Sequence, residues 1–102
     1  MIKLAIPNKG RLLSPTLSLL RKVGIAPVDR KRASLTSKTR DPDIELIFVR
    51  PEDIPRLVDR GAADLGITGY DFVQESRVDV KELLDLKFCK ARIVLAAPEG
   101  LG

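Results

Sequence analysis

The sequence contains no histidine and no tryptophan, and it has one tyrosine and one cysteine in 102 residues. Without histidine, imidazole acid–base catalysis, a histidine-dependent nucleophilic triad and a histidine-ligated metal site are all excluded. The single thiol, Cys89, cannot form an internal disulfide and fits a reducing compartment. Several common classes of enzyme site are therefore removed at the outset.

Long apolar runs are also missing. No stretch approaches the roughly 18 consecutive apolar residues of a membrane-spanning helix, and the N-terminus enters a strand-like run without a signal-peptide pattern. We therefore expect a soluble, cytoplasmic protein with no membrane partner. A length of 102 residues, with 44% hydrophobic and 31% charged residues, is typical of one globular unit.

Aromatic residues are scarce beside the positive charge. A net charge of +4 is a feature of proteins that bind phosphate groups, nucleic-acid binders included. With three phenylalanines and one tyrosine, however, a stacking platform for single strands is not expected, and no predicted helix carries a continuous basic face. Small phosphorylated ligands explain the charge more simply, and we expect no nucleic-acid partner.

Strand-like and helix-like segments alternate along the chain. Apolar runs predict strands at 2–7, 44–49, 63–67, 80–86 and 91–97, with a short helix after each of the first three. Residues 28–43 are more polar and predict a strand or loop followed by a turn. The alternation predicts an α/β fold, a mostly parallel sheet with flanking helices. We assign 1–97 to this lobe and 98–102 to the start of a linker.

Capping signals place the three helix starts. Ser14 can cap the first helix. Asp53 is the expected N-cap of the second, because Pro55 then falls in the first turn, where its missing N–H costs nothing. Thr68, followed three positions later by Asp71, matches the capping pattern for the third helix.

The segment Pro7-Asn8-Lys9-Gly10-Arg11-Leu12 carries the clearest functional signal. It joins the first strand to the first helix and places a glycine between two cations. Backbone amides and the helix N-terminus can meet a phosphate there, while the cations supply charge. An ordinary turn with solvated cations explains the same residues.

A second argument favours the functional interpretation. Right-handed crossovers bring the turns after residues 7, 49 and 67 to the carboxyl edge of the sheet, where open α/β folds bind ligands. The residues expected to converge there are Lys9, Gly10, Arg11, Arg50, Thr68 and Gly69.

Other candidates have two interpretations. Arg50 is either a ligand contact or an ion-pair partner of Asp53 or Glu52, and Gly66 permits the close approach of a ligand or of another backbone. A solvated face or ligand phosphate contacts explain the cation cluster that follows the first helix. Its members are Arg30, Lys31, Arg32, Lys38 and Arg40.

Four motifs in order resemble the ATP phosphoribosyltransferase family, over essentially the whole chain. They are Pro7-Asn8-Lys9-Gly10-Arg11-Leu12, Phe48-Val49-Arg50-Pro51-Glu52-Asp53-Ile54-Pro55, Gly61-Ala62-Ala63-Asp64-Leu65-Gly66-Ile67-Thr68-Gly69 and Leu83-Leu84-Asp85-Leu86. The resemblance implies transfer of the phosphoribosyl group of phosphoribosyl pyrophosphate (PRPP) to N1 of ATP, with Mg2+ and release of pyrophosphate, the first step of histidine biosynthesis. It also implies one of the two lobes of a type II periplasmic-binding-protein-like fold.

The resemblance also assigns residues. The family's first phosphate-contacting loop falls on Lys9, Gly10 and Arg11, of which Arg11 and Lys9 are the predicted catalytic residues. A further family arginine corresponds to Arg30 or Arg32, and Asp71 is either a cap or a ligand contact. The predicted substrate-binding set is Lys9, Gly10, Arg11, Arg30, Arg32, Arg50, Gly66, Thr68 and Gly69.

One family signature is missing. The acidic residue and Ser/Thr-Gly-x-Thr loop of the second lobe, which bind PRPP, do not occur in this sequence. The chain is therefore either a fragment of the enzyme or a lone lobe that binds nucleotide or phosphate weakly without turnover. An uncovered cleft face would favour self-association, so we expect a homo-oligomer, with a regulatory domain or subunit left open.

Overall fold

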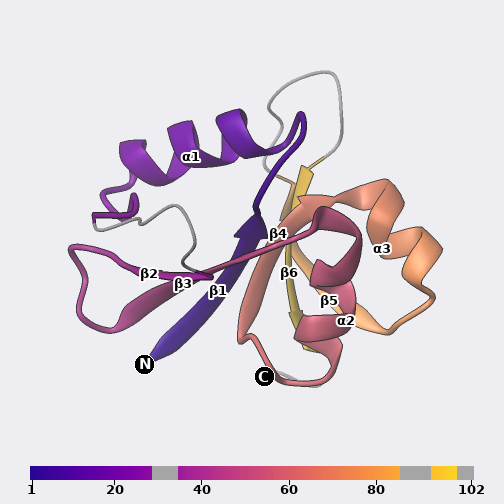
Figure 1. Cartoon of the computed structure of the whole chain (residues 1–102). Coiled ribbons are helices and arrows are strands. Elements are labelled where there is room, and N and C mark those ends of the chain that lie inside the picture. The colour runs from indigo at the N-terminus through magenta and orange to yellow at the C-terminus, as the bar shows by residue number, and fades with distance from the viewer. Residues whose placement is uncertain (29–34, 86–92, 99–102) are drawn as a thin grey trace.

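The computed structural model describes residues 1–28, 35–85 and 93–98. Its strands form one sheet in the order β2-β3-β1-β4-β6-β5 (Figure 1). The strands are β1 (Ile2–Pro7), β2 (Thr36–Lys38), β3 (Ile44–Val49), β4 (Leu65–Gly69), β5 (Val80–Asp85) and β6 (Ile93–Pro98). The helices are α1 (Leu13–Lys22), α2 (Ile54–Asp59), which follows the 3-10 turn η1 (Pro51–Asp53), and α3 (Tyr70–Ser76).

The sheet is mixed. β1 pairs in parallel with β3 and β4, whereas β2 is antiparallel to β3, and β6 is antiparallel to both β4 and β5. The α/β class is confirmed, but the prediction of a mostly parallel sheet is wrong. A strand's direction follows from its connection, and the apolar pattern from which β5 and β6 were predicted does not encode it.

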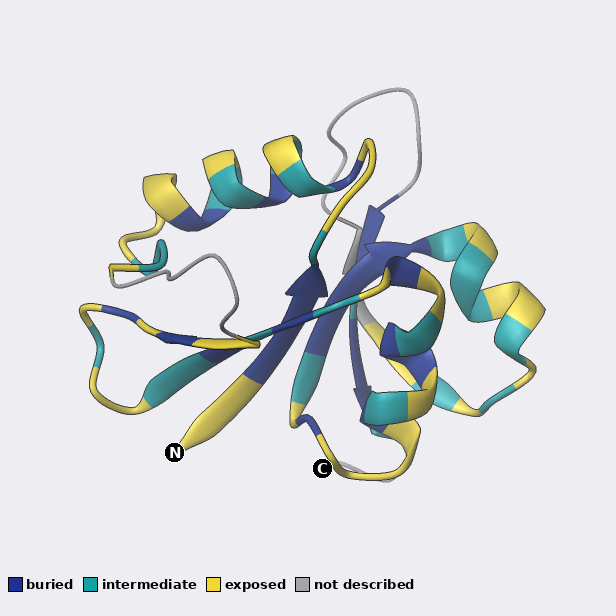
Figure 2. Ribbon diagram, in the orientation of Figure 1, coloured by how far each residue is buried: buried dark blue, intermediate teal, exposed yellow. Residues whose placement is uncertain are grey.

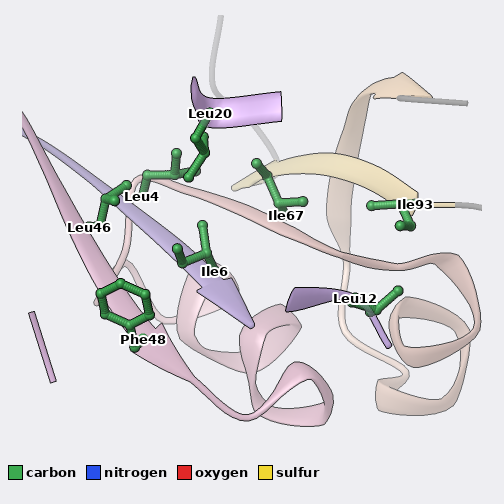
Figure 3. Close-up of a cluster of buried hydrophobic side chains, with 8 residues drawn as sticks. All are labelled: Leu4, Ile6, Leu12, Leu20, Leu46, Phe48, Ile67 and Ile93. Carbon is green, nitrogen blue, oxygen red and sulfur yellow. The ribbon is translucent and has the colours of Figure 1, made fainter. Parts of the chain in front are cut away.

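The helices cover both faces of the central strands (Figure 1). Alternation along β1 sends Leu4 and Ile6 into a core with Leu20 of α1, and sends Ala5 to the other face with α2. Figure 3 shows the larger core, whose buried members are Leu4, Ile6, Leu12, Leu20, Leu46, Phe48, Ile67 and Ile93. The outer face of α1 is exposed (Figure 2). Its amphipathic pattern therefore fixes the helix against the sheet.

Gly66 is the point where α2 meets β4. A Cβ at this position would lie 2.6 Å from Cγ2 of Ile54 and 2.8 Å from Cγ2 of Val58. The close approach predicted for Gly66 is therefore made by the lobe's own helix.

The first helix begins without a side-chain cap. α1 starts at Leu13, its N-cap is Leu12, and Ser14 already lies inside the helix, so the predicted Ser14 cap is wrong. The N–H of Leu13 donates instead to the carbonyl of Gly10, which continues the preceding turn into the helix. Within the described residues, none of the helices is both long and apolar enough to cross a membrane.

Candidate functional site

The three parallel strands end at one edge of the sheet, which we call the carboxyl edge. The register pairs Pro7 of β1 with Val49 of β3, and pairs Ala5 with Gly66 of β4. Residues 8–12 leave this edge after β1, residues 50–53 leave it after β3, and α3 follows directly on Gly69 (Figure 1). The predicted convergence of these turns at one edge is confirmed.

Direct contacts hold the turn after β1 to its neighbours. The N–H of Asn8 donates to the carbonyl of Val49 at 2.9 Å, which extends the pairing of β1 with β3 by one bond. On the other side, a Cβ at Gly69 would lie 3.6 Å from Cδ1 of Leu12. The turn is thus packed between the ends of β3 and β4.

Thr68 holds the turn after β3. Its side chain is fully buried, and its hydroxyl donates to the carbonyl of Pro51 at 2.8 Å. The predicted helix cap at Thr68 is wrong, because β4 continues to Gly69 and α3 begins at Tyr70. The hydroxyl is engaged inside the lobe, and the substrate contact predicted for Thr68 stays a prediction.

The Lys9-Gly10-Arg11 turn presents its cations to solvent. Gly10 has φ +81°, in the left-handed region that favours glycine. Leu12, 8% exposed, anchors the turn in the core, while Lys9 and Arg11 are exposed. Among the described residues, neither cation forms an ion pair. Both charges are therefore available to an anion at this edge.

Arg50 sits at the start of the turn after β3. Its Nε donates to Oδ2 of Asp53 at 2.9 Å, and the two side chains are 59% and 40% exposed. Asp53, the predicted N-cap of α2, occupies that position but makes no capping hydrogen bond. The ion pair predicted as one alternative for Arg50 is present with Asp53.

Asn8 is a polar residue of this edge that sequence reasoning missed. Its Oδ1 is buried and has no hydrogen-bond partner within the described part of the chain. A buried acceptor left unpaired costs about 1–3 kcal/mol. The sequence signal was its position, directly after a buried strand and directly before Lys9.

The remaining predicted site residues are Arg30, Arg32, Gly69 and Asp71. Arg30 and Arg32 lie outside the described residues. A Cβ at Gly69 would lie 2.6 Å from Oδ1 of Asp71 and 3.2 Å from Cδ2 of Phe72, so the first turn of α3 packs closely against this position. Asp71 is exposed in that turn. Among the described residues, no group of three or more acidic, histidine or cysteine side chains could hold a metal ion.

The carboxyl edge carries three exposed cations, Lys9, Arg11 and Arg50. A pocket of about 450 Å³ lies away from this edge, between Arg21 near the end of α1 and Arg40 in the turn before β3.

The fold places this chain in the class of open α/β lobes. Such lobes bind ligands where parallel strands end, and here those ends carry three exposed cations and the glycines Gly10 and Gly69. The chain belongs to the ATP phosphoribosyltransferase family, whose model matches residues 50–102.

Relatives extend the match to nearly the whole chain. An ATP phosphoribosyltransferase of Methanopyrus kandleri is 57% identical over 99 residues, which cover 97% of this chain and 35% of the relative. One of Sulfolobus acidocaldarius is 55% identical over 97 residues, which cover 95% of this chain and 34% of the relative. The chain thus spans about a third of the length of these relatives.

A solved structure has the same fold. It is a chain of the ATP phosphoribosyl transferase (HisG:HisZ) complex from Thermotoga maritima, with a TM-score of 0.70 and 32% identity. The match covers 86% of this chain and 41% of that chain.

Proposed function

We propose that this chain is the first lobe of the catalytic region of an ATP phosphoribosyltransferase. The enzyme would transfer the phosphoribosyl group of PRPP to N1 of ATP and release pyrophosphate, the first step of histidine biosynthesis. The observation that carries the proposal is the gathering of Lys9, Arg11 and Arg50 at the carboxyl edge of a lobe from this family.

Phosphoribosyl transfer needs little help from a nucleophilic side chain. N1 of adenine attacks the anomeric carbon of PRPP as the bond from that carbon to the pyrophosphate oxygen breaks. Positive charge grows on the sugar, while the leaving pyrophosphate takes the electron pair. Orientation of both substrates and neutralisation of the leaving group dominate such a reaction. We assign neutralisation to Lys9 and Arg11, with Arg11 nearest the reacting centre, and phosphate binding to Arg50 and to the backbone at Gly10 and Gly69.

We propose that Mg2+ enters with the phosphates of the substrate, because Mg2+ is commonly held by substrate phosphates with one or two carboxylates. Bound to PRPP, it would offset pyrophosphate charge.

The lobe would form half of a cleft in a type II periplasmic-binding-protein-like fold. The exposed cations of its carboxyl edge support this arrangement, as does its coverage of about 35% of the relative from M. kandleri. In this proposal residues 1–97 make the lobe, although β6 extends to Pro98. The name of the T. maritima complex supports assembly with a further chain, such as a regulatory partner. We also propose that the enzyme is a cytoplasmic homo-oligomer.

A chimera tests the activity. This chain would replace the matching 99-residue segment of the M. kandleri relative, and pyrophosphate release would be measured with PRPP, ATP and Mg2+. We expect release that requires both substrates, as in the parent enzyme. A folded chimera that is inactive while the parent is active would contradict the proposal.

The exposed cations of the carboxyl edge also suit one alternative, a lone lobe that binds nucleotide or phosphate weakly without turnover. Calorimetry of the 102-residue chain with ATP, AMP and PRPP tests it. Binding at micromolar to millimolar ligand by this chain, together with an inactive chimera, would favour the alternative. The absence of heat with every ligand would contradict it.

A further inference from the structure

Asp53 holds Arg50 from two sides. Its backbone N–H donates to the carbonyl of Arg50 at 2.9 Å, and its Oδ2 accepts from Nε of the same residue at 2.9 Å. The backbone of Arg50 is extended, with φ −61° and ψ 137°, immediately before the 3-10 turn. The turn is thus closed around one arginine by one aspartate.

The backbone beneath this pair is anchored. The carbonyl of Pro51 accepts hydrogen bonds from the N–H of Ile54 and from the hydroxyl of Thr68. Pro51, Ile54 and Thr68 are buried. The base of the Arg50 side chain is therefore fixed, and its charged end is restrained, among the described residues, by Asp53 alone.

Fold stability does not account for the pair. At 59% and 40% side-chain exposure, an ion pair in water contributes little to stability. The contact uses only Nε, so the two terminal Nη groups make no hydrogen bond to the described residues. Those two groups can bind an anion through two parallel hydrogen bonds.

We propose that Asp53 is a positioning residue, which aims the Nη groups of Arg50 at a phosphate oxygen of the substrate at the carboxyl edge. The proposal rests on the proposed function, because it takes the ligand to be a pyrophosphate-bearing molecule. It joins the two interpretations of Arg50, since the ion pair prepares the ligand contact.

The direction in which Asp53→Asn changes anion affinity separates a positioning role from a purely electrostatic one. Asp53→Asn removes a negative charge beside an anion site, which by charge alone should tighten anion binding. If the charge-assisted bond to Asp53 restrains Arg50, the weaker neutral bond to asparagine returns rotamer freedom that binding must remove, and anion affinity falls. The neighbouring Glu52→Gln removes the same charge from an exposed side chain that forms no ion pair with Arg50 in the described structure, and serves as the matched control.

The experiment measures pyrophosphate binding by calorimetry, both to the 102-residue chain and to the chimera. We expect Asp53→Asn to weaken binding about fivefold, on the scale of one freed long side chain, and Glu52→Gln to leave it unchanged or slightly tighter. With Arg50→Gln already present, adding Asp53→Asn should no longer weaken binding. Thermal unfolding of the two single variants should be alike.

Three results would overturn the proposal. They are Asp53→Asn binding pyrophosphate as tightly as Glu52→Gln, wild-type binding that is indifferent to Arg50→Gln, and wild-type protein that binds no pyrophosphate in either form. Failure of the proposed function looks different. A chimera without turnover whose pyrophosphate affinity still depends on both Arg50 and Asp53 would refute the enzyme and keep the positioning role.

Discussion

The hydroxyl of Thr68 donates to the carbonyl of Pro51 at 2.8 Å, and this bond joins the end of β4 to the turn after β3. The two residues are separated by 17 positions in the sequence, and both are buried. The bond therefore fixes two of the three turns of the carboxyl edge relative to each other.

Thr68→Val should loosen that edge. The substitution keeps the shape of the side chain but removes a buried hydrogen bond, so we expect a loss of about 1–2 kcal/mol of unfolding free energy in urea. Hydrogen exchange should show faster opening at the N–H groups of Asp53 and Ile54. Thr39→Val, at the opposite edge of the sheet, removes a hydroxyl bonded to the carbonyls of Asp41 and Ile44 and is the control. Equal exchange at Asp53 in both variants would contradict the linking role.

Gly66→Ala should destabilise by overpacking. The new methyl would meet Ile54 and Val58 at less than van der Waals distance, and forced insertions of this kind cost about 1–3 kcal/mol. Adding Val58→Ala makes room, so the double variant should be more stable than the sum of the two single losses predicts. Strictly additive losses in urea denaturation would show that Val58 does not crowd a side chain at position 66.

Gly10→Ala separates backbone strain from packing. A Cβ at Gly10 meets nothing within 4 Å, but φ is +81°, and a left-handed conformation costs a non-glycine residue about 1–2 kcal/mol. Val58→Ala should give no relief here. An unfolding free energy equal to that of wild type would contradict the conformation of the turn.

Asn8→Leu should be close to neutral for stability. Because Oδ1 of Asn8 is buried without a partner, an apolar side chain of similar size removes an unsatisfied acceptor and loses no described hydrogen bond of that atom. We expect the free energy of unfolding in urea to lie within about 1 kcal/mol of the wild-type value. Any difference should favour Asn8→Leu, because the variant no longer buries an unpaired acceptor. A loss as large as that of Thr68→Val would indicate a partner for Oδ1.

The sequence predicted the central strands β1 and β3 well, and the outer strands of the sheet less well. The runs that became β1 and β3 are continuous and apolar, and the glycine and cations between β1 and α1 mark the turn. The directions of β2, β5 and β6 were not predictable, because a strand pattern is the same in parallel and antiparallel pairs. The extent of β4 was missed because Thr68 and Asp71 match a capping pattern that the buried threonine does not use.

Parts of the site lay beyond sequence reasoning. The spacing of Arg50 and Asp53 allowed an ion pair, but their exposure and the use of Nε alone are properties of the folded turn. The neighbours of Gly66 and the unpaired oxygen of Asn8 depend on packing between distant segments. The cations themselves were found because exposed charge in a strand-to-helix turn is visible in the sequence.

The most direct test of the central claim is Arg11→Ala in the chimera. Arg11 is exposed and forms no ion pair among the described residues, so its removal should change the unfolding free energy by less than about 0.5 kcal/mol. If it stabilises charge at the reacting centre, kcat for pyrophosphate release from PRPP and ATP should fall about 100-fold or more. Arg21→Ala, an exposed arginine at the far end of α1, should leave kcat unchanged. An Arg11→Ala chimera with the kcat of the unsubstituted chimera would contradict a catalytic role for the carboxyl edge.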